Sequence, residues 1–372
     1  MLTLGSNRRS PKGVLLLEDG SCFEGEAVAP GTRFGEVVFN TSMTGYQEIL
    51  TDPSYRGQIV VMTQPHMGNY GMSDEADESR QPWVEGFLAR QFSTVAPRGE
   101  ALPEYLSRHG LPAIEGIDTR ALVRRLRRNG CLKGVMTTER TDVEALAEEL
   151  AAFPSMSGRS LVDEVSCKEP YELGPLAGEA RFHLAVYDFG VKANILRHLQ
   201  ARGARLTVLP AHTSAAECLG LGVDGVVLSN GPGDPEPLAS IQQNVAELVA
   251  SNIPLFGICL GHQLLALALG GRTVKLKFGH HGGNQPVRDI ATGQVTITSQ
   301  NHGFAVVPES LPESCTATDI NLNDGTLEGF AVTDRPVFAV QYHPEAAPGP
   351  QDASGLFDRF LAVVGDRAGA HP

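Results

Sequence analysis

Strand-like and helix-like segments alternate through the second half of the chain, and this alternation constrains the fold more than any other feature. It predicts a mainly parallel, doubly wound sheet with helices on both faces. Ligands in such sheets bind beyond the carboxyl ends of the strands. The expected strands cover residues 183–187, 205–209, 225–228 and 253–256, and the expected helices cover residues 193–202 and 241–250.

The first half of the chain predicts a separate domain with mixed α/β structure. Short strand patterns occupy residues 13–17, 36–39 and 58–62. One helix is expected from Asp118, a good N-cap, to Asn129, with Gly130 just past its end, and another is expected after Asp142. We therefore expect an N-terminal domain at residues 1–168, a linker at 169–181 and a second domain at 182–372.

Cys259 lies where a predicted strand turns into a predicted helix. It sits in the sequence Gly-Ile-Cys-Leu-Gly at 257–261, between the apolar run 253–256 and an apolar helical pattern at 263–269. This is the nucleophile-elbow pattern G-x-S-x-G with Cys in place of Ser. The glycines permit a backbone too tight for side chains, and a helix N-terminus favours the reactive thiolate. The N–H of Leu260 could stabilise an oxyanion.

The alternative is that Cys259 is only a small buried hydrophobe, as most cysteines in a reducing compartment are. That alternative does not explain why glycines flank Cys259 on both sides of a sharp turn. The other five cysteines have no such surroundings and are interpreted as structural: Cys22, Cys131, Cys167, Cys218 and Cys315.

A second motif supplies the groups that a cysteine nucleophile needs. The apolar run 337–340 leads to His343, and Glu345 follows two residues later. His343 can accept the thiol proton, and Glu345 can hold the imidazole in the required tautomer. Alone, a His-x-Glu sequence is more often a surface pair, but together with the elbow it predicts a catalytic triad.

A Gly-Pro-Gly turn follows the strand at 225–228. The N–H of Gly231 in this turn could form the second half of an oxyanion hole, although an ordinary turn is the simpler interpretation of the motif alone. The nearby match to G-x-G-x-x-G at 220–225 is interpreted as accidental. It precedes a strand, whereas a dinucleotide fingerprint follows a strand and opens a helix.

These motifs, in this order, resemble the class I glutamine amidotransferases, whose glutaminase domain uses a Cys-His-Glu triad to release ammonia from glutamine. Segments 277–287 and 299–304 narrow the resemblance to the small chains of carbamoyl phosphate synthetase. Segment 39–48 resembles the N-terminal domain of those small chains, which other amidotransferases lack. The shorter segments 51–55, 69–71 and 116–120 do so as well. One departure is Gln285, where the resemblance leads us to expect His.

The resemblance implies a set of site residues. Cys259 would attack the amide carbon, His343 would act as base, Glu345 would orient it, and the N–H groups of Gly231 and Leu260 would bind the oxyanion. Ser42 comes from the N-terminal half, so the site is expected between the two domains. The residues assigned to glutamine binding are Ser42, Gly231, Gly233, Leu260, Gln263, Asn301, Gly303 and Phe304.

The resemblance also implies a partner. The chain has no G-x-x-x-x-G-K-[ST] motif, so ATP, Mg²⁺ and bicarbonate are expected on a separate large chain, which would receive ammonia internally. We expect a heterodimer, with a higher oligomer of heterodimers left open, and a role in arginine synthesis, pyrimidine synthesis or both. No cofactor or metal is expected in this chain, because His280 and His281 have no companion ligands nearby in the sequence.

Composition excludes several classes of function. The formal net charge of −13 argues against binding to nucleic acid or to an anionic membrane. No apolar run is long enough to span a bilayer, and residues 14–17 are too short for the core of a signal peptide. Six scattered cysteines without metal spacing fit a reducing cytoplasm.

Two other functions remain as alternatives. One is a glutaminase that serves a different synthetase, such as one that makes anthranilate or GMP, but the N-terminal segment 40–48 argues against it. The other is a non-catalytic regulatory or binding protein on the same scaffold. Such a protein would tolerate loss of the triad, whereas Cys259, His343 and Glu345 are all present.

Overall fold

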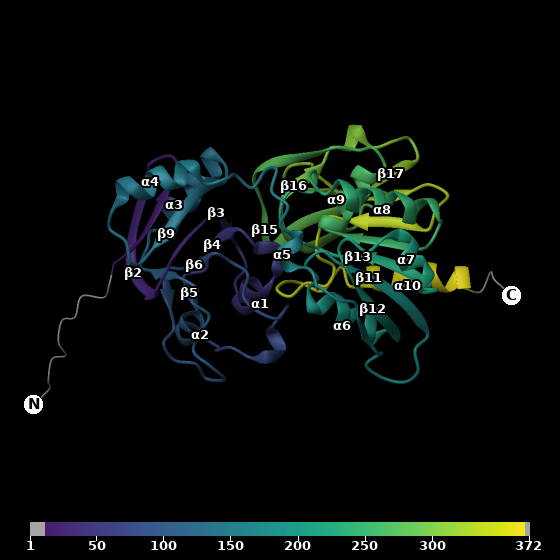
Figure 1. The fold of residues 1–372 in the computed structure, drawn as a ribbon, viewed down its shortest axis with the longest axis horizontal. Helices are drawn as coiled ribbons and strands as arrows, with labels where there is room; N and C mark the ends of the chain where they lie inside the picture. Colours follow the sequence, from purple (N-terminus) through teal and green to yellow (C-terminus); the bar gives the residue numbers. More distant parts are fainter. Residues whose placement is uncertain (1–11, 369–372) are drawn as a thin grey trace, which may run out of the picture. The chain divides into compact units, whose positions relative to one another are not determined.

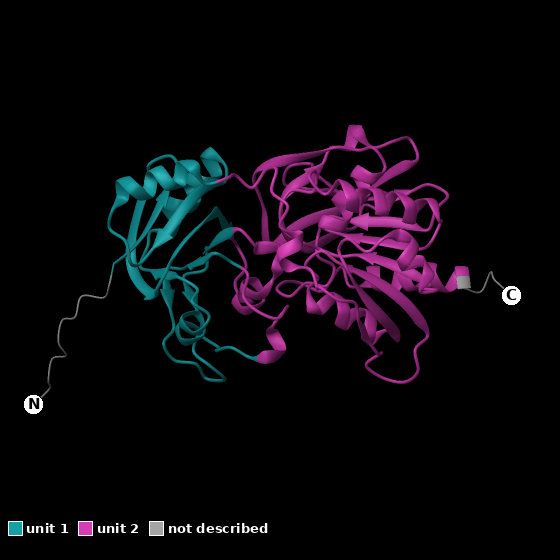
Figure 2. Ribbon diagram, in the orientation of Figure 1, with its two compact units in different colours: residues 1–39, 58–73, 84–153 teal, residues 40–57, 74–83, 154–372 magenta. Residues whose placement is uncertain are grey.

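A computed structural model describes residues 12–368 of the chain, which form two compact units (Figure 1, Figure 2). Unit 1 runs up to Phe39 and takes in residues 58–73 and 84–153. Unit 2 takes residues 40–57, 74–83 and 154 onward. Each unit is therefore assembled from several separate segments of the chain. The domain boundaries predicted at 168 and 182 stay a prediction.

Unit 1 is built on a closed barrel with the strand order β1-β2-β8-β6-β4-β3-β9. Most neighbouring strands are antiparallel, whereas β6 is parallel to both β4 and β8. Closure removes the free sheet edges, and the sequence patterns did not predict it. The strands are β1 (Lys12–Leu17), β2 (Cys22–Ala29), β3 (Thr32–Asn40), β4 (Gln58–Met62), β5 (His66–Met67), β6 (Gly86–Leu88), β7 (Gln91–Phe92), β8 (Ala113–Glu115) and β9 (Leu132–Thr137). The helices are α2 (Leu102–Arg108), α3 (Thr119–Asn129) and α4 (Val143–Ala152).

Helix α3 begins and ends where its sequence predicts. The Asp118 carboxylate accepts a hydrogen bond from the N–H of Ala121 at 2.9 Å and so caps the first turn. Gly130 follows the last turn with a φ of +100°, a conformation that favours glycine. Leu122 and Leu126 lie one turn apart and are fully buried. The predicted start of α4 is also confirmed.

Unit 2 is built on a ten-stranded sheet with the order β10-β12-β11-β13-β14-β19-β18-β17-β15-β16. Its centre, from β12 to β19, is parallel and confirms the predicted doubly wound architecture. The strands beyond β19 are antiparallel, an extension that the sequence did not predict. The strands are β10 (Tyr171–Leu173), β11 (Phe182–Asp188), β12 (Ala204–Pro210), β13 (Gly225–Leu228), β14 (Leu255–Ile258), β15 (Thr273–Asp289), β16 (Val295–Val306), β17 (Cys315–Asn321), β18 (Leu327–Val332) and β19 (Val337–Val340).

The two faces of this sheet carry separate apolar cores. Successive residues of a strand point to opposite faces, so Ala185 and Tyr187 enter one core while Leu184 and Val186 enter the other. Helices α7, α8 and α9 cover the first face, and α6 and α10 cover the second. The helices of this unit are α1 (Tyr46–Thr51), α5 (Val162–Val165), α6 (Ala193–Ala201), α7 (Ala215–Gly220), α8 (Ala239–Ala250), α9 (Leu260–Ala268) and α10 (Gly355–Ala368).

The segment expected to be a linker contributes to the sheet. Within residues 169–181, strand β10 pairs antiparallel with β12 at the edge of unit 2. Its side chains are mostly exposed, so it lacks the apolar pattern by which a buried strand is recognised.

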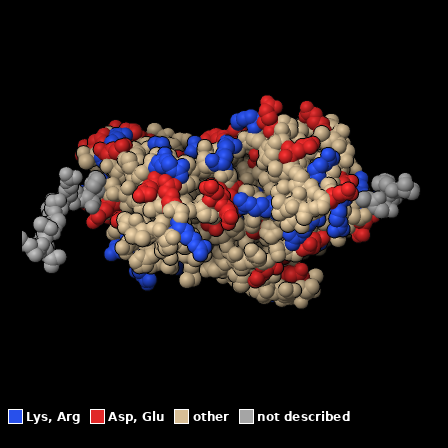
Figure 3. Space-filling view, turned by 90° about the horizontal axis from the view of Figure 1, so that it is seen from below, with Lys and Arg blue, Asp and Glu red and all other residues tan. Residues whose placement is uncertain are grey.

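Charges are interspersed on the face of the molecule drawn in Figure 3. Acidic and basic side chains alternate over it without a large patch of one sign, despite the net charge of −13. Across residues 12–368 no helix has the length and apolar character needed to cross a membrane.

Candidate active site

Cys259 occupies a strained turn between β14 and α9. Its φ of +53° and ψ of −101° are unfavourable for a residue with a side chain. The turn depends on glycine, because a Cβ at Gly261 would lie 2.2 Å from the carbonyl oxygen of Leu228. A Cβ at Gly257 would likewise meet the Gly261 backbone at 2.9 Å. The structure thus confirms the strand–turn–helix geometry that the sequence predicts for an elbow.

The Cys259 side chain is almost completely buried and has two polar neighbours. Its thiol lies 3.7 Å from the carbonyl oxygen of Asn301, a possible acceptor. The side-chain amide of Gln341 donates to Sγ at 3.6 Å. A donor at the sulfur favours negative charge there, as a nucleophilic thiolate requires.

His343 and Glu345 follow β19 and form a buried pair. Nδ1 of His343 lies 2.6 Å from Oε1 of Glu345, which fixes the orientation of the ring. Nε2 of His343 has no partner at hydrogen-bond distance among residues 12–368. Burial lowers the pKa of His343, but the charges of Glu345 and Cys259 outweigh burial and raise this pKa above 6.5. Nε2 of His343 is thus left available, and its role as acceptor of the Cys259 proton stays a prediction.

Lys192 joins this pair, although the sequence did not point to it. Its Nζ lies 3.0 Å from Oε1 of Glu345, and both side chains are buried. Burial raises the pKa of Glu345, but Lys192 and His343 outweigh it and lower this pKa below 4.5. Glu345 therefore stays ionised opposite His343. Lys192 follows β11 at the carboxyl edge of the parallel strands. Because ligands bind at this edge, a search for charged residues just after the predicted strands could have identified Lys192.

Two backbone N–H groups predicted to form an oxyanion hole are available as donors. Neither the N–H of Leu260, the first residue of α9, nor that of Gly231 donates to another group among residues 12–368. A Cβ at Gly231 would lie 2.2 Å from the Phe189 carbonyl oxygen, so the backbone can approach this closely only as glycine. These N–H groups follow β14 and β13, two neighbouring parallel strands.

The residues predicted to bind glutamine all belong to unit 2. Ser42 is nearly buried, and its hydroxyl has no partner among the described residues. The side-chain N–H₂ of Gln263 already donates to the Phe304 carbonyl oxygen at 2.8 Å. The side-chain oxygen of Gln263 is therefore the atom left to contact a substrate. Gly233 has a φ of +88°, and a Cβ at Gly303 would meet only open space.

Asp52 holds the Asn301 segment and was missed by the sequence analysis. Oδ2 of Asp52 accepts from the Asn301 side-chain amide at 3.0 Å. The Asn301 side-chain oxygen lies 2.8 Å from Nδ1 of His281. The side chain of Asn301 is thus used internally, and its backbone faces Cys259. Asp52 lies in segment 51–55, but nothing in its sequence neighbourhood indicates this distant partner.

Comparison with known proteins extends over both halves of the chain. Residues 185–363 match the family Glutamine amidotransferase class-I, and residues 15–136 match the family Carbamoyl-phosphate synthase small chain, CPSase domain. Proteins named carbamoyl phosphate synthase small chain from Syntrophotalea carbinolica and Pseudomonas aeruginosa are 53% and 50% identical to it. Each comparison covers 95% of this chain and 98% of the relative. The chain belongs to the carbamoyl phosphate synthase small-chain family.

A further small chain, from Escherichia coli O6:H1, is 49% identical over 94% of this chain and 97% of its own. This family membership confirms the resemblance drawn from the motifs and makes the chain a glutamine amidotransferase, the glutamine-hydrolysing part of a ligase. In this member of the small-chain family, Cys259, His343 and Lys192 all follow parallel strands of one sheet, at their carboxyl ends.

Proposed function

We propose that this chain hydrolyses glutamine to glutamate and ammonia through a thioester on Cys259, and passes the ammonia to the large chain of carbamoyl phosphate synthetase. The observation that carries the proposal is the strained, glycine-flanked Cys259 beside the buried His343–Glu345 pair. A structural cysteine needs neither the strain nor the pair.

The first half of the reaction forms the thioester. His343 takes the Cys259 proton, and the thiolate attacks the side-chain amide carbon of glutamine. The N–H groups of Gly231 and Leu260 stabilise the negative charge that develops on the amide oxygen. His343 then gives its proton to the amide nitrogen as the carbon–nitrogen bond breaks, and ammonia leaves.

The second half releases glutamate. Water loses a proton to His343 and attacks the thioester carbon, again through an oxyanion. The carbon–sulfur bond breaks, and the Cys259 thiolate returns. Throughout, Glu345 keeps the imidazole oriented and stabilises its positive form, and Lys192 keeps Glu345 ionised.

The glutamine pocket is proposed to use Ser42, Gly231, Gly233, Leu260, Gln263, Asn301, Gly303 and Phe304. The free Ser42 hydroxyl and the Gln263 oxygen are suited to the polar ends of glutamine. The open space at Gly303 leaves room for the substrate chain, and the buried Phe304 ring provides an apolar wall.

The large chain is proposed as the site of the ATP-dependent steps. The sequence of this chain has no nucleotide-binding motif, and its relatives are named as small chains. ATP, Mg²⁺ and bicarbonate would be bound by the large chain, so this chain itself would need no cofactor for glutamine hydrolysis. The pathway served by the product, arginine synthesis, pyrimidine synthesis or both, depends on what consumes it.

The test is Cys259→Ser in the complex with the large chain. Glutamine-dependent synthesis of carbamoyl phosphate should fall to background, because a hydroxyl is a much poorer nucleophile beside this base. Synthesis from added ammonia should persist. Cys218→Ser, at a buried cysteine of α7, is the matched control and should retain glutamine-dependent synthesis. Loss of ammonia-dependent synthesis in an intact Cys259→Ser complex would contradict the proposed division of work.

A further inference from the structure

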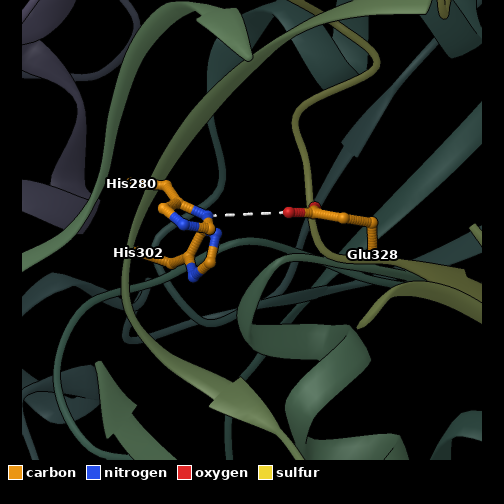
Figure 4. A group of neighbouring side chains, drawn as sticks. All are labelled: His280, His302 and Glu328. Carbon is orange, nitrogen blue, oxygen red and sulfur yellow. Dashed lines mark ion pairs between the residues drawn. The ribbon is translucent and has the colours of Figure 1, made fainter. Parts of the chain in front are cut away.

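Three buried side chains converge in unit 2 outside the predicted triad (Figure 4). His280 comes from β15, His302 from β16 and Glu328 from β18, and none is more than 6% exposed. One ligand atom from each lies within 4.8 Å of those of the other two. Burial of so many polar atoms is costly unless they are paired or bind an ion.

The outer nitrogen of each histidine faces an acceptor. Nε2 of His280 lies 2.8 Å from Oδ2 of Asp324, and Nδ1 of His302 lies 2.8 Å from the carbonyl oxygen of Phe304. A carboxylate and a carbonyl can only accept, so the histidines donate these hydrogen bonds. A neutral imidazole that donates from its outer nitrogen carries a lone pair on its inner nitrogen. This is the usual outer support of metal-binding histidines.

The inner nitrogens face a further acceptor, the side-chain oxygen of Gln300. This oxygen lies 2.9 Å from Nδ1 of His280 and 3.0 Å from Nε2 of His302. Its orientation is fixed, because the Gln300 amide donates to the Thr298 hydroxyl at 3.1 Å, and that hydroxyl donates to the Gln285 carbonyl oxygen. If the amide were reversed, the Gln300 oxygen would face the Thr298 hydroxyl oxygen, whose proton is already donated to Gln285.

Glu328 adds negative charge to the same space. Its Oε1 lies 3.6 Å from Nδ1 of His280 and also accepts from the Asn321 amide at 2.9 Å. Its Oε2 is buried and has no hydrogen-bond partner within residues 12–368. Lone pairs from His280, His302 and Gln300 therefore converge beside the Glu328 carboxylate. A cation would satisfy all of them.

We propose that these four side chains bind a divalent transition metal, with zinc as the best match. Two histidines and a glutamate are ordinary zinc ligands, and a zinc–nitrogen bond of about 2.0 Å implies ligand atoms about 3.3 Å apart in a tetrahedron. The observed distances between neighbouring ligand atoms, 2.9, 3.0 and 3.6 Å, lie on either side of this value. Protonating His280 alone, between Asp324 and Glu328, would leave the lone pair on Nε2 of His302 against the Gln300 oxygen. Protonating both histidines would place two buried positive charges in rings 4.9 Å apart.

Such a site would be structural, because the protein fills all four positions. His302 stands between Asn301 and Gly303, so the metal would fix this part of β16 against β15 and β18. The Asn301 carbonyl oxygen faces the Cys259 thiol. The metal would thus hold a wall of the candidate active site. The proposal stands independently of glutamine hydrolysis, and it revises the expectation that this chain holds no metal.

The test is metal binding by the full chain, prepared without a polyhistidine tag. The protein is stripped with a chelator, dialysed against zinc and analysed for bound metal and for its Tm. We expect close to one equivalent of zinc and a Tm higher by roughly 5 °C at saturating zinc. Cobalt(II) should bind in its place and give the visible absorption of a tetrahedral site.

Glu328→Gln keeps the shape of the side chain and should lose the bound zinc and the Tm shift. His212→Gln is the control, because His212 also contacts a carboxylate, Asp163 at 2.7 Å, but lies exposed outside the cluster. It should bind zinc as the unmutated chain does. Zinc far below one equivalent, with no Tm shift and no cobalt spectrum in the unmutated chain, would overturn the proposal and leave a hydrogen-bonded network only. Zinc retained by Glu328→Gln would also overturn it.

Discussion

Single residues at the candidate site depend on partners far away in the sequence. Cys259 and the His343–Glu345 pair are recognisable from local motifs, because glycines and strand ends surround them. Lys192 and Asp52 are not, since both act through long-range contacts. Lys192 contacts Glu345 and the Ala346 carbonyl oxygen, and Asp52 accepts from Asn301 and Asn230. A buried lysine or aspartate leaves no periodic signal, so the sequence could point to the proposed reacting groups but not to the residues that contact them.

The roles of His343 and Glu345 predict an order of severity. His343→Asn removes the proton acceptor and should slow thioester formation by on the order of 10⁴-fold, while Glu345→Gln removes only orientation and charge and should cost about 10²-fold. Single-turnover measurement of the glutamyl thioester gives both rates. If the Glu345 variant were the slower of the two, the roles would be misassigned.

The ionised state of Glu345 predicts a dependence of stability on pH. Its folded pKa is lowered below 4.5, so its contribution to stability is present above pH 4.5 and is lost as the pH falls through the folded pKa. The Tm of the unmutated chain should therefore fall more steeply below pH 4.5 than the Tm of Glu345→Gln. Parallel curves for the two proteins would show that the carboxylate of Glu345 is not stabilised in the folded chain.

At the scale of elements, patterns with regular periods were predicted well and irregular ones were not. Helix α3 and strand β4 have the bounds that the sequence predicts. The long hairpin of β15 and β16 was missed, because its Gly-rich centre reads as a loop. Its register shifts between Lys275 and His280 and again between Gly282 and Gln285, and these irregularities break the alternation of a strand. His280 stands directly at the end of the first of these shifts.

The packing of α9 on β13 predicts an effect of one methyl group. In Gly261→Ala the new Cβ would lie 2.2 Å from the Leu228 carbonyl oxygen, so the helix must shift. We expect a loss of about 1–3 kcal/mol in the free energy of unfolding, together with slower thioester formation, since α9 carries Leu260. The matched control is Gly220→Ala at the end of α7, where a Cβ meets nothing within 4 Å. A Gly261 variant as stable as the control would contradict this close packing.

At the scale of the whole molecule, the proposed partner predicts regulated hydrolysis. The chain carries the three residues proposed as a triad, and its sequence lacks the motif G-x-x-x-x-G-K-[ST], so unregulated glutaminase activity would waste glutamine. We expect the isolated chain to be a weak glutaminase that speeds up with the large chain, and more with ATP and bicarbonate. A coupling of about 1–3 kcal/mol would change the rate roughly 5- to 150-fold. Glutamate release under the three conditions measures it, and equal rates would indicate a stand-alone glutaminase.

Segments of the two units alternate along the chain, and this limits how the gene can be cut into functional parts. Segments 40–57 and 74–83 belong to unit 2, although long stretches of unit 1 lie between them and the rest of it. No single cut separates the units, so a gene fragment that begins at residue 182 would encode the amidotransferase match without Ser42 or Asp52. Recombination at one point would therefore transfer the proposed triad and Lys192 without Ser42 and Asp52, so the two halves are expected to be inherited together.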